Sequence, residues 1–302
     1  MEDVKSIKKI DIHAHATAFP QYFPPFWGGG QRFISAEETI AFYDRLGIEK
    51  GVLQPLVAAE AKTTPSTTEE CKYIVDKHPD RFILFCNVDP RAITNTPDAD
   101  FSGILAFYKE KLGAKGLGEL TANLYADDKR VDNLFGACSE MELPVTIHLV
   151  PDFISYGLVD ELGLPRLEKM LKKHPKLKIL GHSEPFWSEI SADNTNETRG
   201  GYPQGKIIDG KIAELMRNYE GLYCDLSAGS GTNAMTRDPE YTARFVEEFS
   251  DRILYGCDFT ATSNTHPFKL TETLEKMLDD GVISPKNYKK IVRDNAVKLL
   301  KL

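Results

Sequence analysis

The chain has 302 residues, of which 41% are hydrophobic and 27% charged, and this composition excludes global disorder. Acidic residues outnumber basic ones by 45 to 37, and the net charge of −8 disfavours nucleic acids and anionic membranes as partners. No apolar run reaches the roughly 18–20 residues of a membrane span, and the first ten residues lack the apolar stretch of a signal peptide. Five scattered cysteines without a C-x-x-C pair fit a reducing compartment, so we expect a cytoplasmic protein.

Short apolar runs alternate with amphipathic stretches along the whole chain. The expected strands are Lys9–His15, Lys50–Leu56, Phe82–Val88, Ala114–Glu119, Pro144–Leu149, Leu177–His182, Gly221–Leu226 and Ile253–Asp258. The expected helices are Ala36–Leu46, Thr67–Lys77, Phe101–Leu112, Arg130–Met141, Gly163–Lys173, Gly205–Asn218, Pro239–Phe249, Phe268–Asp279 and Pro285–Leu300.

This alternation predicts an α/β fold in which helices cover a parallel sheet. Eight such units in roughly 250 residues predict a (β/α)8 TIM barrel with long βα loops and extra C-terminal helices. We expect residues 1–302 to form a single domain, with a doubly wound open sheet as the competing fold. The position of the polar residues distinguishes the two folds, because the carboxyl ends of all strands meet at one face in a closed barrel.

The first expected strand ends in an H-x-H pair, His13 and His15. Since side chains alternate along a strand, Asp11, His13 and His15 should face the barrel interior, and Ile10 and Ile12 the covering helices. Two imidazoles about 6–7 Å apart along a strand can converge on one metal ion. Asp11 is expected either to orient a ligand histidine or to be buried near the barrel floor.

Three later strands also end in a polar residue, namely His148, His182 and Asp258. Burying these groups together with the H-x-H pair would be costly unless a partner compensates them. A divalent cation would be such a partner. The alternative is a set of separate histidines, each satisfied within the core.

Taken together, the H-x-H pair, the single histidines after the fifth and sixth strands and the aspartate after the eighth resemble the amidohydrolase superfamily. The segment Ile291–Ala296 resembles the helix that ends many members of its second large subgroup. That subgroup, amidohydrolase-related family 2, also contains aminocarboxymuconate-semialdehyde decarboxylase and related aromatic-acid decarboxylases.

The resemblance implies that His13, His15, His148 and Asp258 bind Zn²⁺ or a similar divalent ion, with Mn²⁺ as an alternative. His182 would ligate a second metal in a binuclear site. In a mononuclear site it would instead act as an acid or base, or polarise the substrate.

The fourth strand departs from many relatives, which carry a carboxylated lysine there. Here Lys115 lies near the start of the strand and Glu119 at its carboxyl end. A Gly-Glu pair at this point is similar to that of TatD-type hydrolases, where the glutamate is a ligand. Glu119 either bridges two metals or faces the substrate beside a single metal.

These features predict a metal-dependent hydrolase that attacks an amide, ester or lactone of a small molecule with a metal-activated water. Asp258 would act as general base, and His182 would stabilise the oxyanion or protonate the leaving group. The alternative is a nonoxidative decarboxylase of an unsaturated or aromatic acid. The acidic net charge disfavours a TatD-type nuclease. A non-catalytic protein that keeps the metal ligands is a further hypothesis.

Trp27 lies in the long aromatic segment Ala16–Ser35, directly after the H-x-H strand. The segment either forms an apolar lid over the substrate or packs on a neighbouring copy, which would make the protein a homodimer.

Trp187 and Arg199 follow the sixth strand and should overhang the same mouth. Arg199, like Arg32 and Arg237, could clamp a substrate carboxylate through a bidentate contact. We therefore name Trp27, Trp187 and Arg199 as candidate substrate-binding residues.

Overall fold

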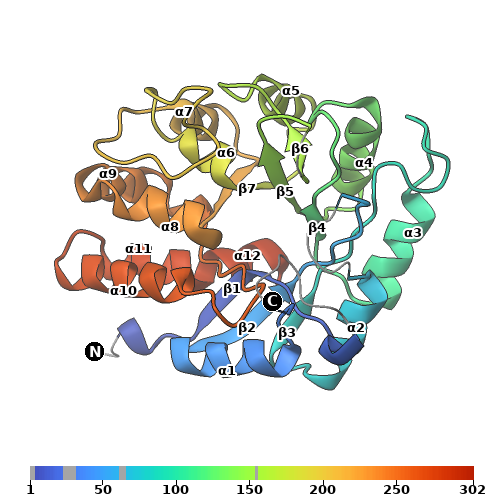
Figure 1. Ribbon diagram of the computed structural model, residues 1–302, viewed down its shortest axis with the longest axis horizontal. Helices are drawn as coiled ribbons and strands as arrows, with labels where there is room; N and C mark the ends of the chain where they lie inside the picture. Colours follow the sequence, from blue (N-terminus) through green and yellow to red (C-terminus); the bar gives the residue numbers. More distant parts are fainter. Residues whose placement is uncertain (1–3, 23–31, 61–65, 154–155) are drawn as a thin grey trace.

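In the computed structural model, which describes residues 4–22, 32–60, 66–153 and 156–302, parallel strands form a ring surrounded by helices (Figure 1). The strands are β1 (Lys9–Ala14), β2 (Ile48–Leu53), β3 (Phe82–Leu84), β4 (Leu117–Leu120), β5 (Val145–Val150), β6 (Leu158–Val159), β7 (Ile179–His182), β8 (Leu222–Asp225) and β9 (Ile253–Leu254). β6 pairs only with β5, so it is an addition to the eight-stranded ring.

The ring consists of two ladders, β1-β2-β3 and β4-β5-β7-β8-β9, joined by backbone hydrogen bonds. Between β3 and β4, the N–H of Cys86 donates to the carbonyl of Gly116, and the N–H of Gly118 donates to that of Cys86, both at 2.9 Å. Between β9 and β1, the N–H of Asp258 donates to the carbonyl of His13 at 2.8 Å. The predicted TIM barrel is thereby confirmed, and the open sheet is excluded.

Helices follow the strands as expected, and three of them form the C-terminal extension. They are α1 (Ala36–Leu46), α2 (Thr68–Lys77), α3 (Ser102–Ala106), α4 (Lys129–Glu140), α5 (Pro165–Lys173), α6 (Glu184–Ser188), α7 (Lys211–Asn218), α8 (Ala228–Thr236), α9 (Pro239–Phe249), α10 (His266–Asp279), α11 (Pro285–Lys289) and α12 (Asn295–Leu300). One π-helical turn continues α3 over Phe107–Lys111, and another joins α11 to α12 over Lys290–Asp294. No helix in the described ranges is long and apolar enough to cross a membrane.

Local capping explains several of these boundaries. Ser35 and Glu38 form a capping box at the start of α1, and Gly47 ends this helix in the left-handed conformation. The helices α2 and α5 end at Lys77 and Lys173, each before a His-Pro pair, as the sequence predicts.

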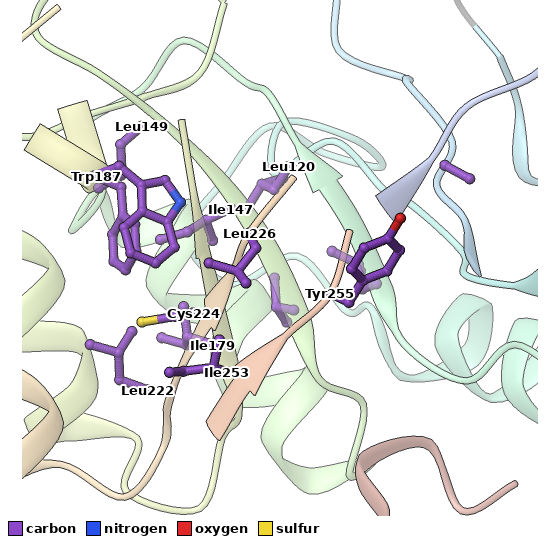
Figure 2. Close-up of a cluster of buried hydrophobic side chains, with 14 of the residues drawn as sticks. Leu120, Ile147, Leu149, Ile179, Trp187, Leu222, Cys224, Leu226, Ile253 and Tyr255 are labelled. Atoms are coloured by element: carbon purple, nitrogen blue, oxygen red, sulfur yellow. The ribbon is translucent and has the colours of Figure 1, made fainter. Parts of the chain in front are cut away.

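The hydrophobic core has two layers. Outward-facing strand residues pack with the helices, and Figure 2 shows the part of this layer around Ile147, Ile179 and Trp187. Inside the ring lies a smaller cluster of Ile10, Ile12, Val52, Ile83, Phe85, Leu180 and Leu254, together with Ala296 and Leu300 of α12.

The expected orientation of the first half of β1 is wrong. Ile12 packs in the interior cluster, whereas Asp11 faces α1 and accepts a 2.6 Å hydrogen bond from the hydroxyl of Tyr43. The register between β1 and β2 shifts between Asp11 and Ala14, so alternation is broken there and His13 faces the interior. Asp11 accepts a hydrogen bond from the backbone N–H of His13 at 2.9 Å.

Candidate metal centre

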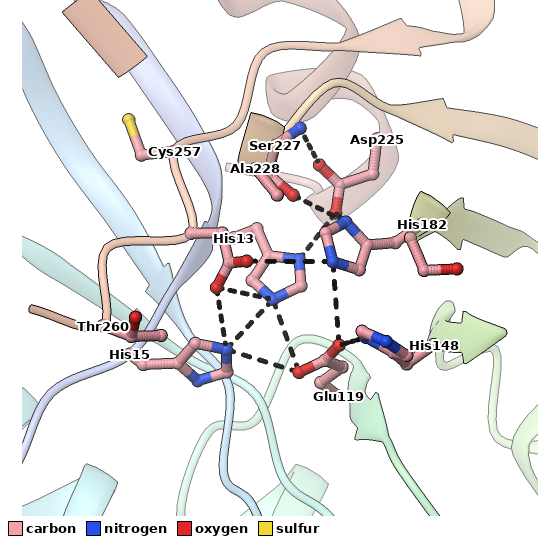
Figure 3. A network of polar contacts seen from close by, with 12 residues as sticks. His13, His15, Glu119, His148, His182, Asp225, Ser227, Ala228, Cys257 and Thr260 are labelled. Carbon is pink, nitrogen blue, oxygen red and sulfur yellow. Dashed lines mark hydrogen bonds and ion pairs between the residues drawn. The ribbon is translucent and has the colours of Figure 1, made fainter. Parts of the chain in front are cut away.

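Polar side chains meet at the carboxyl ends of the strands, and Figure 3 labels all of them except Asp258. One comes from β1, one from the residue directly after it, and the others from β4, β5, β7 and the segment after β9: His13, His15, Glu119, His148, His182 and Asp258. All six positions were predicted from the sequence. Their roles as ligands or catalytic groups stay predictions.

The carboxylate of Glu119 lies between two pairs of imidazoles. Its Oε2 is 3.4 Å from Nε2 of His15 and 3.7 Å from Nε2 of His13. Its Oε1 is 2.6 Å from Nδ1 of His148 and 3.8 Å from Nε2 of His182. Each oxygen thus faces a different pair of nitrogen donors.

Asp258 lies on the solvent side of this cluster. Its Oδ1 is 3.5 Å from Nε2 of His15 and 3.9 Å from Nε2 of His13, and its Oδ2 is 3.8 Å from Nε2 of His182. The side chain of Asp258 is 20% exposed, whereas that of Glu119 is 5% exposed. Of the two carboxylates, Asp258 is therefore the one within easier reach of an incoming molecule.

The donor atoms form compact sets in which all atoms lie within 4.8 Å of one another. Two of these sets share no residue. One contains His13, His15 and Asp258, and the other contains Glu119, His148 and His182.

Sequence reasoning missed Asp225, which ends β8 inside the barrel. Its Oδ2 accepts a 2.7 Å hydrogen bond from Nδ1 of His13, and its Oδ1 accepts one from the backbone N–H of Ser227 at 2.9 Å. The signal was a polar residue at a strand end, but the expected strand ran on to Leu226 and so appeared to end in an apolar residue.

Two further ring nitrogens of the cluster, on His15 and His182, are hydrogen-bonded to neighbouring groups. Nδ1 of His15 donates to the carbonyl of Gln54 at 2.9 Å, and Nδ1 of His182 is hydrogen-bonded to the hydroxyl of Ser227 at 2.9 Å. Because His13 and His15 donate through Nδ1 to groups that only accept, their Nε2 atoms carry the lone pair when the rings are neutral.

Electrostatics favour anionic carboxylates at this site. Burial alone would raise the pKa of Glu119, but the charge of His148 and hydrogen bonds from His13 hold it well below its usual range. Burial alone would lower the pKa of His13, yet the charge of Asp225 raises it well above its usual value. Burial, together with the charge of His13, lowers the pKa of His182.

The pKa shifts of the histidines indicate whether a cation fits the site. Glu119 is the main group that raises the pKa of His148, against the effect of burial, so His148 and His13 both bind a proton more tightly than a free imidazole does. A divalent ion would take the place of those protons, since ligands bind deprotonated. Imidazole nitrogens and carboxylate oxygens suit Zn²⁺ and Mn²⁺, so the residues present fit such an ion.

The three predicted substrate-binding residues have different positions. Trp27 lies outside the described residues. Trp187 is 2% exposed, packs in the hydrophobic layer and donates its indole N–H to the carbonyl of Asp225 at 2.8 Å. Arg199 is also 2% exposed. Contact of any of the three with a substrate stays a prediction.

A model of the amidohydrolase family matches residues 10–302. The chain belongs to this family. It is therefore an enzyme of the amidohydrolase superfamily, and the predicted resemblance is confirmed. No curated protein matches its sequence significantly.

Solved structures show the same fold at low sequence identity. An uncharacterised TIM-barrel protein from Bordetella bronchiseptica has a TM-score of 0.64 and 17% identity, with 98% of this chain and 99% of that chain covered. A dihydroxybenzoic acid decarboxylase from Polaromonas, with bound manganese and 2-nitroresorcinol, has a TM-score of 0.59 and 18% identity over 98% and 97%. A probable 2-pyrone-4,6-dicarboxylic acid hydrolase from Acinetobacter baumannii has a TM-score of 0.61 and 13% identity over 98% and 100%.

Proposed function

We propose that this amidohydrolase hydrolyses an amide, ester or lactone bond of a small molecule with two divalent cations, Zn²⁺ or Mn²⁺, in the cluster. The position of Glu119 carries the proposal, because its two oxygens face separate pairs of imidazoles. The two donor sets without a common residue would each hold one ion, with the Glu119 carboxylate between them. His182 then belongs to the second set.

When bound, such cations lower the pKa of a coordinated water toward about 7 and polarise a carbonyl. Asp258 is placed to take the proton of the attacking water, because its carboxylate lies beside both donor sets and reaches solvent. It can then pass that proton to the leaving group. Asp225 and Ser227 keep the rings of His13 and His182 oriented during these steps.

Turnover by the metal-loaded protein tests this proposal. A panel of chromogenic amides, esters and lactones should contain substrates that the wild type hydrolyses and that His148→Ala does not. His174→Ala is the matched control, since His174 caps the end of α5 outside the cluster and is hydrogen-bonded to Asp132 at 2.8 Å. Equal turnover by His148→Ala and the wild type, or none by the wild type over the whole panel, would contradict the proposal.

Nonoxidative decarboxylation is the second candidate. It is supported by the decarboxylases among the solved structures of this fold, two of which contain manganese. Release of CO2 from an unsaturated or aromatic acid without net consumption of water would establish it. Failure with every acid in a broad panel would count against it.

A further inference from the structure

Glu184, Tyr156 and Tyr202 lie next to the histidine cluster but are not among its donor atoms. The ring of Tyr156 packs on that of His148, with a centroid distance of 4.5 Å. Glu184 follows His182 by two residues, as the first residue of α6, and is partly buried. We call these three residues the acidic rim, after the carboxylate of Glu184.

Tyr202 holds Glu184 in place. The Tyr202 hydroxyl donates to Oε1 of Glu184 at 3.2 Å. The same hydroxyl lies against Gly229, where an added Cβ would come within 2.9 Å of it. Gly229 follows Ser227, the partner of His182, by two residues, so Tyr202 lies near the segment that holds this histidine.

The charges that act on the rim are negative. The charges of Glu119, Asp258 and Glu184 all act on Tyr156. Glu119 and Asp258 face the proposed cations, which would balance their charge. Glu184 is in none of the donor sets, so its charge remains available to a substrate.

Of the arginines that could attract a carboxylate, Arg32 is already paired with an acidic group, whereas Nε and Nη2 of Arg199 and Nε of Arg237 have no hydrogen-bond partner among the described residues. Arg32 makes two hydrogen bonds to the carboxylate of Glu38, at 3.0 and 2.7 Å. Burial lowers the pKa of Arg199, and the charges that act most on it are those of Glu189 and Asp160. A substrate carboxylate at Arg32 would have to compete with Glu38.

We propose that the acidic rim selects substrates with a protonated amine near the scissile carbonyl, bound by Glu184, over substrates with a carboxylate there. This inference rests on the proposed hydrolytic function and names its substrate class. An ammonium group donates strong charge-assisted hydrogen bonds to a carboxylate, and the Tyr202 hydroxyl keeps one oxygen of Glu184 fixed. A carboxylate in the same place would meet like charge.

Three anilides of similar size test the selectivity: β-alanyl-, propionyl- and succinyl-p-nitroanilide, which are cationic, neutral and anionic. The metal-loaded wild type should have its highest kcat/KM with the β-alanyl compound and its lowest with the succinyl compound. Glu184→Gln should lower the ratio of β-alanyl to propionyl kcat/KM about tenfold, the size of one hydrogen bond to a charged group. Tyr202→Phe should lower that ratio less.

Glu240→Gln is the matched control, because it removes the same charge from a side chain that is 83% exposed and pairs with Lys206. It should leave the ratio unchanged. A preference of the wild type for the succinyl compound, or an unchanged ratio in Glu184→Gln, would overturn the inference while hydrolysis itself stands.

Measurements of ligand binding test the proposed selectivity independently of hydrolysis. Calorimetry on the metal-loaded protein would compare the hydroxamates of β-alanine, propionic acid and succinic acid. If no anilide is hydrolysed but the cationic hydroxamate binds tightest and loses this advantage in Glu184→Gln, the selectivity stands and hydrolysis fails. Equal or reversed affinities, or no binding at all, would overturn the selectivity.

Discussion

Asp225 fixes the orientation of the His13 imidazole ring. Its 2.7 Å hydrogen bond to Nδ1 leaves Nε2 of His13 directed at Glu119 and His15. The carbonyl of Asp225 is held in turn by the Trp187 indole. A carboxylate behind a histidine fixes the ring and raises its basicity toward a metal ion.

We expect Asp225→Asn to weaken metal binding about 10–100-fold, because it keeps the shape of the side chain but removes its charge. Competition with a chromogenic chelator measures the affinity. Asp132→Asn serves as control, since Asp132 holds His174 outside the cluster in a similar pair. An affinity unchanged in Asp225→Asn would show that this carboxylate does not support a ligand.

At this scale the sequence predicted which strand ends carry polar residues, but not the orientation of every side chain. The register shift in β1 turns Asp11 toward Tyr43, and a shift of this kind has no signature in the alternation of residues. Asp225 was missed because a strand end misjudged by one residue hides the last polar position.

Among the elements, α5 depends on a buried acid at its start. Asp160 accepts hydrogen bonds from the backbone N–H groups of Arg166 and Leu167, at 3.0 and 2.8 Å. These bonds satisfy donors that the first helical turn leaves unpaired. Burial nevertheless raises the pKa of Asp160 from 3.8 to about 6.

This shift predicts a specific pH dependence of stability. Because the native state holds the Asp160 proton more tightly, the stabilisation is complete below pH 3.8 and is lost as the pH rises through about 6. The loss amounts to about 3 kcal/mol at most. Urea unfolding at pH 4, 5, 6 and 7 should show Asp160→Asn gaining free energy of unfolding relative to the wild type as the pH rises. Two curves that stay parallel would contradict the assignment.

The strand β7 and the helix α6 fit together only because Gly181 has no side chain. An added Cβ there would lie 2.2 Å from the ring of Phe186. We expect Gly181→Ala to lower the free energy of unfolding by about 1–3 kcal/mol, as overpacking does. Chemical denaturation measures this, and Gly200→Ala, where a Cβ meets nothing within 4 Å, should be nearly neutral. Similar stability of the two variants would contradict the packing argument.

Short elements were the ones that the sequence did not predict. The helix α8 contains two glycines, two threonines and an asparagine, all poor helix formers, and it is held by packing against α6, α9 and α10. The helix α6 and the strand β6 are too short for a periodic pattern to show. Long amphipathic helices such as α1 and α9 agree with their predicted bounds.

In the whole molecule, barrel closure brings the cluster together. The hydrogen bond from Asp258 to the carbonyl of His13 joins the last strand to the first, and His148 and His182 lie opposite each other in the β5–β7 register. The alternation of eight strands with helices made this closure predictable. The number of cations stays a proposal, because it rests on where the two oxygens of Glu119 point.

The metal content of the purified protein, loaded with Zn²⁺ or Mn²⁺ and freed of excess ion, tests the central claim most directly. Elemental analysis should find two ions per chain in the wild type and one in Glu119→Gln, whose folding is checked by circular dichroism. One ion or none in the saturated wild type, or two in Glu119→Gln, would contradict a carboxylate placed between two cations.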